Sequence, residues 1–274
     1  MIPFGPGEIP ASSSEAAQRI ENTIAAMIAD KKGRRPEVQC ELGNPGEINR
    51  LSVDISNLES AATEARKPGS FSRLGAGIMR NFAVVGHPLI IYGAPVDLQI
   101  QGQNMPVEWV RDDRGELWLM PSQNGVAGES SPDGFAEISV PAARFEDAVR
   151  AALTAAAEAN GARLKDMRLR IESAGPRSVV VAVDVAASKF MMTARLRAVA
   201  DAALDQNMNL RVNNVEVTGD GAAGSMVANM IAGRLGEWRG RVIPLSQYMF
   251  AGAALRDVQI ETGDTLRLRA SFGQ

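Results

Sequence analysis

Apolar residues recur at three- and four-residue spacing over residues 143–160, and this pattern predicts the helix around which the rest of the chain is organised. Phe145, Val149 and Leu153 fall on one face of that helix. Alanine, the strongest helix former, fills many of the other positions, and Glu146 in the first turn favours the helix N-terminus. Because alanine side chains are small, we expect this thin helix to lie close against a sheet.

Four segments after this helix alternate between apolar and polar residues, which is typical of strands with one buried face. The segments are residues 164–172, 178–186, 192–202 and 209–218. The short turns between them predict an antiparallel meander, with one apolar face and one face that carries arginine and lysine. The phase of the pattern changes at Asn213-Asn214, which predicts a β-bulge. The alanine content of 192–202 leaves a helix open as an alternative for that segment.

A second apolar helix is predicted at residues 222–238. The large apolar residues on its predicted face are Met226, Val227, Met230, Ile231, Leu235 and Trp238. Beyond this helix, residues 241–250 read as an extended apolar segment. The chain closes with a predicted hairpin formed by residues 255–261 and 265–272.

The N-terminal half has a similar order of elements. An amphipathic helix is predicted at residues 15–31 and another at 71–82, where Phe71 and Phe82 lie on the apolar side. The remaining predicted elements are strands at 37–42, 48–58, 89–92, 96–101, 107–111 and 116–120, and a polar loop at 61–70. Residues 1–14 are rich in Pro, Gly and Ser and are expected to form a flexible arm.

These patterns predict an α+β fold in which a curved antiparallel sheet, a half-barrel, wraps around long amphipathic helices. The Ser-, Gly- and Pro-rich stretch 121–134 is the predicted linker between a first half at 15–120 and a second half at 135–274. Each half has helix, strands, helix and strands in that order. Two architecturally similar halves are therefore expected, without detectable sequence identity between them.

Composition narrows the classes of function. The chain has 274 residues, is 45% hydrophobic and carries a formal net charge of −3, which argues against nucleic-acid binding because that requires a basic footprint. Cys40 is the single cysteine and is expected to be a buried or half-buried strand residue. No segment approaches the roughly 20 apolar residues of a membrane-spanning helix, and residues 1–10 lack the pattern of a secretory signal. We expect a cytoplasmic or peripheral membrane protein.

The sequence presents no catalytic constellation. His87, the only histidine, precedes Pro88 and is interpreted as a turn residue, and no G-x-S-x-G motif is present. Residues 219–224 match G-x-G-x-x-G, but the preceding strand belongs to an antiparallel meander and not to a parallel dinucleotide-binding unit. Asp112 and Asp113 lie in a turn and are expected to be solvated. We therefore expect no enzyme activity, no cofactor and no metal site, and catalytic carboxylates paired from distant positions stay open.

The order of elements in the second half carries a resemblance to a known family. A glycine-rich turn at 219–224 is followed by an apolar helix, by the segment RVIPL and by the hairpin LRDVQIETGDTLRLRASFG. With RLSVDISNLES upstream, the pattern resembles the LmeA-type phospholipid-binding proteins over most of residues 15–272. The resemblance implies a half-barrel of the tubular lipid-binding kind, with an apolar groove for acyl chains. That family is typically exported, whereas this chain shows no export signal.

We therefore predict that the protein binds or transfers a lipid, or another long apolar ligand, and contacts a membrane surface. The predicted ligand-binding residues are Leu153, Met192, Leu196, Leu210, Met226, Met230, Ile231 and Leu235. The predicted membrane contacts are Phe71, Phe82, Arg234, Trp238, Arg239 and Arg241, and residues 222–250 are the predicted mobile gate. The alternative is a structural or scaffold protein with a filled core that binds an unidentified protein partner, and an unrecognised enzyme is a third alternative.

Overall fold

The protein is mostly β-structure, with 59% of its residues in strands and 20% in helices. Its structure, a computed structural model, describes residues 1–28, 30, 32–60, 69–91, 93–122, 131–159, 161–189, 192–245 and 255–273. Within these ranges there are three helices and two sheets, neither of which is closed. The predicted α+β half-barrel, a sheet wrapped around long amphipathic helices, is therefore wrong.

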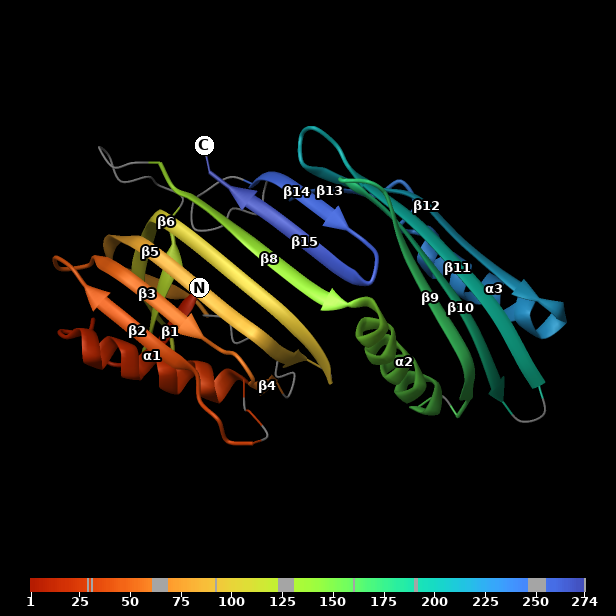
Figure 1. Cartoon of the computed structure of the whole chain (residues 1–274), viewed down its shortest axis with the longest axis horizontal. Helices are drawn as coiled ribbons and strands as arrows, with labels where there is room; N and C mark the ends of the chain where they lie inside the picture. The colour runs from red at the N-terminus through yellow and green to blue at the C-terminus, as the bar shows by residue number, and fades with distance from the viewer. Residues whose placement is uncertain are drawn as a thin grey trace. The chain divides into compact units, whose positions relative to one another are not determined.

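The elements are labelled in Figure 1. In chain order they are β1 (Ile2–Pro6), α1 (Ser13–Ile28), β2 (Glu37–Leu42), β3 (Ile48–Asp54), β4 (Glu59–Ser60), β5 (Phe71–Ile91), β6 (Ala94–Asp112), β7 (Glu116–Pro121), β8 (Asp133–Pro141), α2 (Ala142–Ala159), β9 (Arg163–Gly175), β10 (Ser178–Lys189), β11 (Met192–Leu204), β12 (Asn209–Asp220), α3 (Gly221–Gly236), β13 (Val242–Pro244), β14 (Leu255–Glu261) and β15 (Thr265–Phe272).

The chain divides into two compact units. The first unit is built from Met1–Ser139 with residues 255–257 and 269–273, and the second from residues 140–245 with Val258–Leu268. The larger sheet has the strand order β14-β15-β8-β6-β5-β3-β2, to which β1, β4 and β7 add further pairs. The β3–β5 and β4–β5 pairs are parallel, so this sheet is mixed and not antiparallel throughout as predicted.

The first unit has a filled hydrophobic core between α1 and the sheet. Phe4, Ile20, Leu51 and Met105 are buried in it. The ring of Phe4 meets Trp109 edge-on, with 4.8 Å between the ring centroids. Such aromatic pairs add about 0.5–1.5 kcal/mol to the stabilisation that burial provides. The core therefore ties the first residues of the chain to strand β6.

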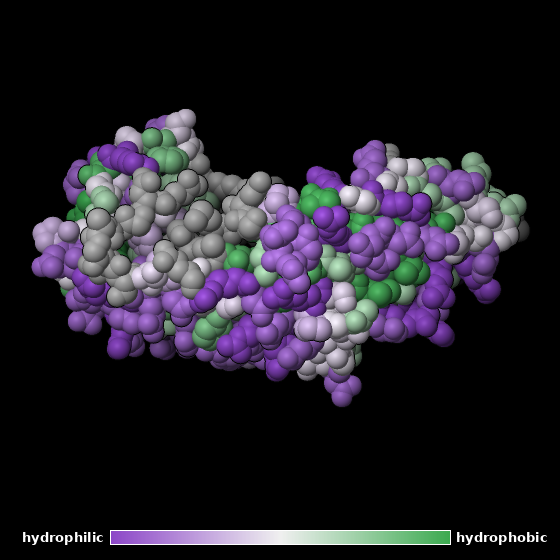
Figure 2. Space-filling model, turned by 90° about the horizontal axis from the view of Figure 1, so that it is seen from above, coloured by the Kyte–Doolittle hydropathy of each residue, from purple (hydrophilic) through white to green (hydrophobic). Residues whose placement is uncertain are grey.

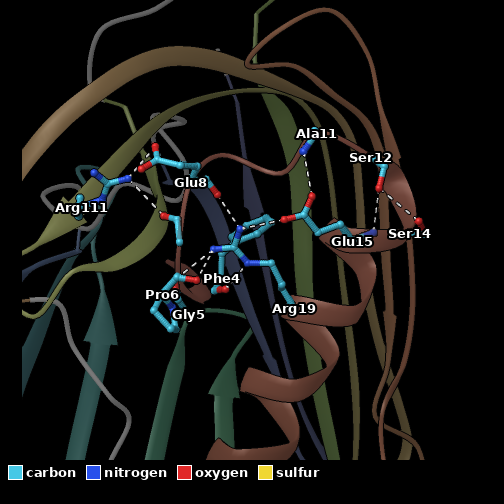
Figure 3. A network of polar contacts seen from close by, with 11 residues as sticks. Phe4, Gly5, Pro6, Glu8, Ala11, Ser12, Ser14, Glu15, Arg19 and Arg111 are labelled. Carbon is cyan, nitrogen blue, oxygen red and sulfur yellow. Dashed lines mark hydrogen bonds and ion pairs between the residues drawn. The ribbon is translucent and has the colours of Figure 1, made fainter.

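Two arginines hold the N-terminal segment, Arg19 with most of the contacts and Arg111 through Gly7 and Glu8 (Figure 3). The guanidinium of Arg19 donates to the carbonyl oxygens of Phe4 at 2.9 Å, Gly5 at 3.2 Å, Pro6 at 3.0 Å and Glu8 at 2.6 Å. Strand β1 also pairs with β7. The stretch 1–14, expected as a flexible arm, thus contains a paired strand whose carbonyls converge on one side chain.

The predicted helix at 71–82 is instead the first half of strand β5, which pairs with β6 along most of its length. Ile78 and Met79 are adjacent in sequence and both buried, as neighbouring residues are when both faces of a strand are covered. A Cβ at Gly77 would lie 2.1 Å from the carbonyl oxygen of Gly46, so glycine permits this close strand contact. With this helix absent, the predicted correspondence between two similar halves also fails.

Asp112, predicted to be solvated, is buried at the β6–β7 turn. Its carboxylate accepts hydrogen bonds from the Arg114 side chain, from Trp118 Nε1 at 3.2 Å, and from the backbone N–H groups of Arg114 and Glu116. Burial alone would raise the pKa of Asp112, but these hydrogen bonds outweigh it and lower the pKa to about 2. The carboxylate therefore stabilises the turn as an anion.

The second unit confirms the predicted meander. Strands β9, β10, β11 and β12 pair antiparallel in sequence order, and β13 extends the sheet beside β12. The segment for which a helix stayed open is strand β11. Asp201 pairs with Asn214 and Ala202 with Val212, so Asn213 is the extra residue of the predicted bulge.

We predict that Arg19→Ala lowers the free energy of unfolding by about 2–3 kcal/mol, because four carbonyl groups lose a charged donor. Arg19→Lys restores little of this loss, since an ammonium group lacks the planar fork of a guanidinium. Urea unfolding followed by the fluorescence of Trp109 measures the change. Arg144→Ala is the control: this exposed helix arginine makes one 3.7 Å ion pair with Asp147, and its loss should change stability by less than about 0.5 kcal/mol. Equal effects of the two alanine variants would contradict the role given to Arg19.

Candidate functional site

The candidate site is the apolar face of the β9–β12 sheet. Residues directly opposite one another on paired strands point to the same face. Two rows of such residues cross the four strands: Leu169, Val183, Ala198 and Val217, and next to them Ile171, Val181, Ala200 and Val215. All eight residues are half-buried. The meander thus presents a continuous aliphatic surface that is only partly covered.

Helix α2 covers the β9 side of this surface. Phe145 and Glu146 of the helix line a hollow of about 380 Å³ together with Leu169 and Ile171 of β9 and Leu266 of β15. No residue of α2 is fully buried, although its apolar stripe at three- and four-residue spacing was correctly predicted. The helix expected at the centre of the fold therefore lies at the border of an open apolar face.

Helix α3 lies on the same face, over β11 and β12 (Figure 1). Gly219 is opposite Leu196 and therefore shares its face. A Cβ at Gly219 would lie 2.1 Å from the carbonyl oxygen of Gly224 in the first turn of α3, and Ala228 one turn later is buried. Gly219 and Gly224, two glycines of the G-x-G-x-x-G match, are thus explained by a helix packed tightly on a strand.

The middle of the apolar face belongs to strand β10. Val181, Val183 and Val185 alternate along this strand and are all half-buried. The contacts of α2 run along β9 and those of α3 along β12 and β11, and within the described part of the chain no helix packs along β10. Val181, Val183 and Val185, called the valine row below, therefore lie on the sheet face between helices α2 and α3. The prediction of ligand contacts missed these valines and Phe145, although the run of valine at 179–185 was visible in the sequence.

The structure places most of the predicted ligand-binding residues around this face. Leu196 and Leu210 lie on it, and Met192 lies on it at the exposed end of β11. Leu153 of α2 and Ile231 of α3 are half-buried. The side chain of Leu235 lies outside the described part of the structure.

Met226 and Met230, also predicted as ligand contacts, point away from the sheet. These two residues are 69% and 66% exposed, whereas Val227, Ala228 and Ile231 are partly or fully buried. The predicted helix face is therefore divided: small and branched residues face the sheet, and the two methionines face solvent. In Figure 2, hydrophobic residues lie exposed between hydrophilic ones over the second unit.

The predicted membrane contacts fall in two places. Trp238 follows α3 and is 43% exposed, and the guanidinium carbon of Arg241 lies 4.5 Å from the centroid of its ring. Arg239 is exposed and donates to the carbonyl oxygen of Val215 at 2.8 Å. The side chain of Arg234 and the gate residues 246–250 lie outside the described residues.

Phe71 and Phe82 belong to strand β5 of the first unit. Phe71 is exposed, and Phe82 packs against the hydrophobic core. Because these two residues were grouped on a helix face that does not form, the basis for treating them as one membrane contact is lost.

The remaining chemical candidates are isolated. His87 Nδ1 lies 3.3 Å from Asp97 Oδ1 in an exposed pair. Burial raises the pKa of the Cys40 thiol to about 11, so the thiolate needed for nucleophilic attack is scarce at neutral pH. Among the described residues, no three His, Cys, Asp or Glu side chains are grouped to hold a metal ion. No described helix is both long and apolar enough to span a membrane.

Comparisons of the chain with models of protein families, with curated proteins and with solved structures found no match.

We predict that Gly219→Ala lowers stability by roughly 1–3 kcal/mol, because its Cβ meets the backbone of α3 and must push the helix off the sheet. Gly233→Ala is the matched control on the same helix. Nothing lies within 4 Å of a Cβ at Gly233, so alanine there should raise stability by about 0.5–1 kcal/mol. Hydrogen exchange of the α3 amides and urea unfolding measure both effects. Unchanged exchange of the α3 amides in Gly219→Ala would show that α3 is not seated on Gly219.

Proposed function

We propose that the protein binds a lipid, or another ligand with a long apolar chain, on the apolar face between α2 and α3. The observation that carries the proposal is the half-buried valine row of β10, which lies between the two helices. Aliphatic side chains in a filled core are normally buried completely. A sheet face on which Val181 and Val183 are only half-buried instead offers surface to an acyl chain.

The chemistry of the face suits an aliphatic ligand. An acyl chain gains about 0.8 kcal/mol for each methylene group removed from water, provided that it buries no unpaired polar group. The two rows that cross β9–β12 carry only Leu, Ile, Val and Ala. The hollow beside α2, with Phe145 and Leu266 in its wall, extends this surface at one side.

Helix α3 and the turn after it are the proposed membrane contact. Met226 and Met230 present apolar surface to solvent, and Trp238 is the type of residue that favours lipid–water boundaries. Arg239 and Arg241 lie close by in the chain, where each contributes about 1 kcal/mol next to an anionic membrane surface. The element that borders the apolar face would then also bring it to the membrane.

We expect lipid to co-purify with the protein and to appear in native mass spectrometry as a discrete mass increment. Val183→Glu should abolish this increment, because a carboxylate on the apolar face is costly to desolvate. Val180→Glu is the matched control, since Val180 lies on the opposite face of the same strand, paired with Glu172 and Asp201. Circular dichroism of both variants reports whether the fold is kept.

The scaffold alternative gives a different result. If the wild-type protein carries no extractable lipid, transfers none between vesicles, and unfolds with Val183→Glu, the face is packed core and the lipid proposal is wrong. The filled core of the first unit is the observation that favours a scaffold role for that part of the chain.

Trp238 allows a direct test of membrane contact. Trp109 and Trp118 are each 1% exposed, so acrylamide quenching reports mainly on Trp238, at 43%. Vesicles containing phosphatidylglycerol should reduce the quenching and shift the emission to the blue, and high salt should weaken the effect by screening. Met230→Glu should abolish the response.

Leu74→Glu is the control for that experiment, because Leu74 is also an exposed apolar residue but lies on strand β5 of the first unit. It should leave the vesicle response intact. Quenching that is unchanged by anionic vesicles would remove α3 as the membrane contact, while the lipid-extraction result would stand independently.

A further inference from the structure

Helix α2 is held to its sheet differently from the other two helices. Helix α1 buries Ala16 and Ile20 completely, and α3 buries Ala228. By contrast, none of the 18 residues of α2 is fully buried. Elements with few buried apolar contacts open locally at the lowest free energy. Of the three described helices, α2 is therefore the one that leaves its sheet most easily.

Arg150 ties α2 to the sheet through a single backbone group. Its guanidinium donates to the carbonyl oxygen of Met167 at 2.7 Å and to Glu146 Oε1 at 2.8 Å. Strand β9 is the last strand of its sheet, so carbonyl groups on its outer edge have no neighbouring strand to accept from. The Arg150 side chain is 40% exposed. Water therefore competes for both partners of this hydrogen bond, which can break and form again without unfolding the sheet.

The surface beside this hydrogen bond continues the apolar face. Met167 is fully buried, and its partner across the strands is Val185 of the valine row. The hollow of about 380 Å³ between Phe145 and Ile171 opens next to it. An apolar chain that enters at this hollow would meet Met167 and then the valine row. Movement of α2 away from β9 widens that entrance.

Helix α3, in contrast, is tied to the sheet at both ends. At its start stands the close glycine contact described above. After its last turn, the Gly240 N–H donates to the carbonyl oxygen of Val212 at 2.7 Å, and Arg239 donates to that of Val215 at 2.8 Å. These ties favour α2, and not the predicted gate at 222–250, as the element that moves.

We propose that α2 is a lid, latched by Arg150 on the Met167 carbonyl, that opens to admit the ligand to the valine row. The proposal rests on the proposed lipid-binding function. The start of the helix stays attached during opening, because the Ala142 N–H donates to the carbonyl oxygen of Asp264 at 2.9 Å. The lid, the latch and the valine row all belong to the second unit.

Hydrogen exchange of the delipidated full chain tests the lid without any ligand. The α2 amides should exchange at least tenfold faster than those of β10, because an isolated helix of this length is marginal in water while the sheet stays paired. Arg150→Leu keeps an apolar stem and removes the donors. It should accelerate α2 exchange by about another tenfold, the effect of losing a charge-assisted hydrogen bond, and leave β10 unchanged.

Arg144→Leu is the matched control. Arg144 is an exposed arginine of the same helix, and its ion pair, at 3.7 Å, is with Asp147 of α2 itself. This variant should leave the exchange of both elements unchanged. If the α2 amides exchange together with those of β10, the helix leaves the sheet only when the unit unfolds, and the lid is ruled out. Unchanged α2 exchange in Arg150→Leu would overturn the latch.

Methionine oxidation is a second measure of opening. Met167 and Met105 are both fully buried, whereas Met226 and Met230 are exposed. Hydrogen peroxide transfers one oxygen atom to an accessible thioether and leaves water, so Met226 and Met230 should be oxidised first. Met167 should follow well before Met105, which lies in the filled core of the first unit. Equal protection of the two buried methionines would contradict the lid.

Uptake of cis-parinaric acid, a fatty acid that fluoresces in apolar surroundings, separates the lid from the function on which it rests. Arg150→Leu should take up this probe about tenfold faster than the wild type, and Arg144→Leu at the wild-type rate. Fast α2 exchange without any uptake would support the lid and contradict the lipid proposal. Uptake with α2 exchange tied to that of β10 would support the lipid proposal and overturn the lid.

Discussion

Cross-strand register is the constraint on which the second unit depends. Successive residues of a strand point to opposite faces, so a shift of one residue would move every aliphatic side chain of a strand to the charged side. Within strand β12 the alternation of apolar and polar residues shifts by one position between Val212 and Val215. In a regular strand, the apolar residues on the two sides of this shift would point to opposite faces of the sheet. The bulge at Asn213 absorbs the extra residue. As a result, Leu210, Val212, Val215 and Val217 all share one face with the valines of β10.

The two units use their apolar residues in different ways. In the first, Phe4, Trp109 and Ile20 fill a core that excludes water, and the N-terminal strand is held by both packing and Arg19. In the second, the sheet face of comparable hydrophobicity is bordered by α2, none of whose residues is buried, and by α3. Burial is thus concentrated in the core of the first unit. The second unit also has buried residues, such as Met167 and Leu204, but leaves part of its aliphatic sheet face accessible.

The sequence predicted elements correctly where the signal was local. Helix α2 and strands β9–β12 follow from periodicity within single segments, and even the bulge at Asn213 was visible as a change of phase. Strand β5 was missed because Phe71, Leu74, Ile78 and Phe82 also fit a helical period. What decides its structure is pairing with β6 and the approach of Gly46 to Gly77, and both involve residues distant in sequence. The candidate face was predicted through Leu196 and Leu210, but Phe145 and the β10 valines required knowledge of which helix lies over which strand.

The orientation of α3 illustrates why hydrophobicity alone assigns a helix face poorly. Its largest apolar residues suggested that Met226 and Met230 face inward. The strand–helix turn instead brings Gly224 onto Gly219, and that close contact leaves no room for a Cβ at either glycine. Ala228 therefore occupies the buried position one turn later, and the methionines are turned outward. Because methionine is flexible and polarisable, it adapts to varied apolar surroundings at little cost. The same tight packing that anchors the helix thus creates the exposed apolar strip on its outer side.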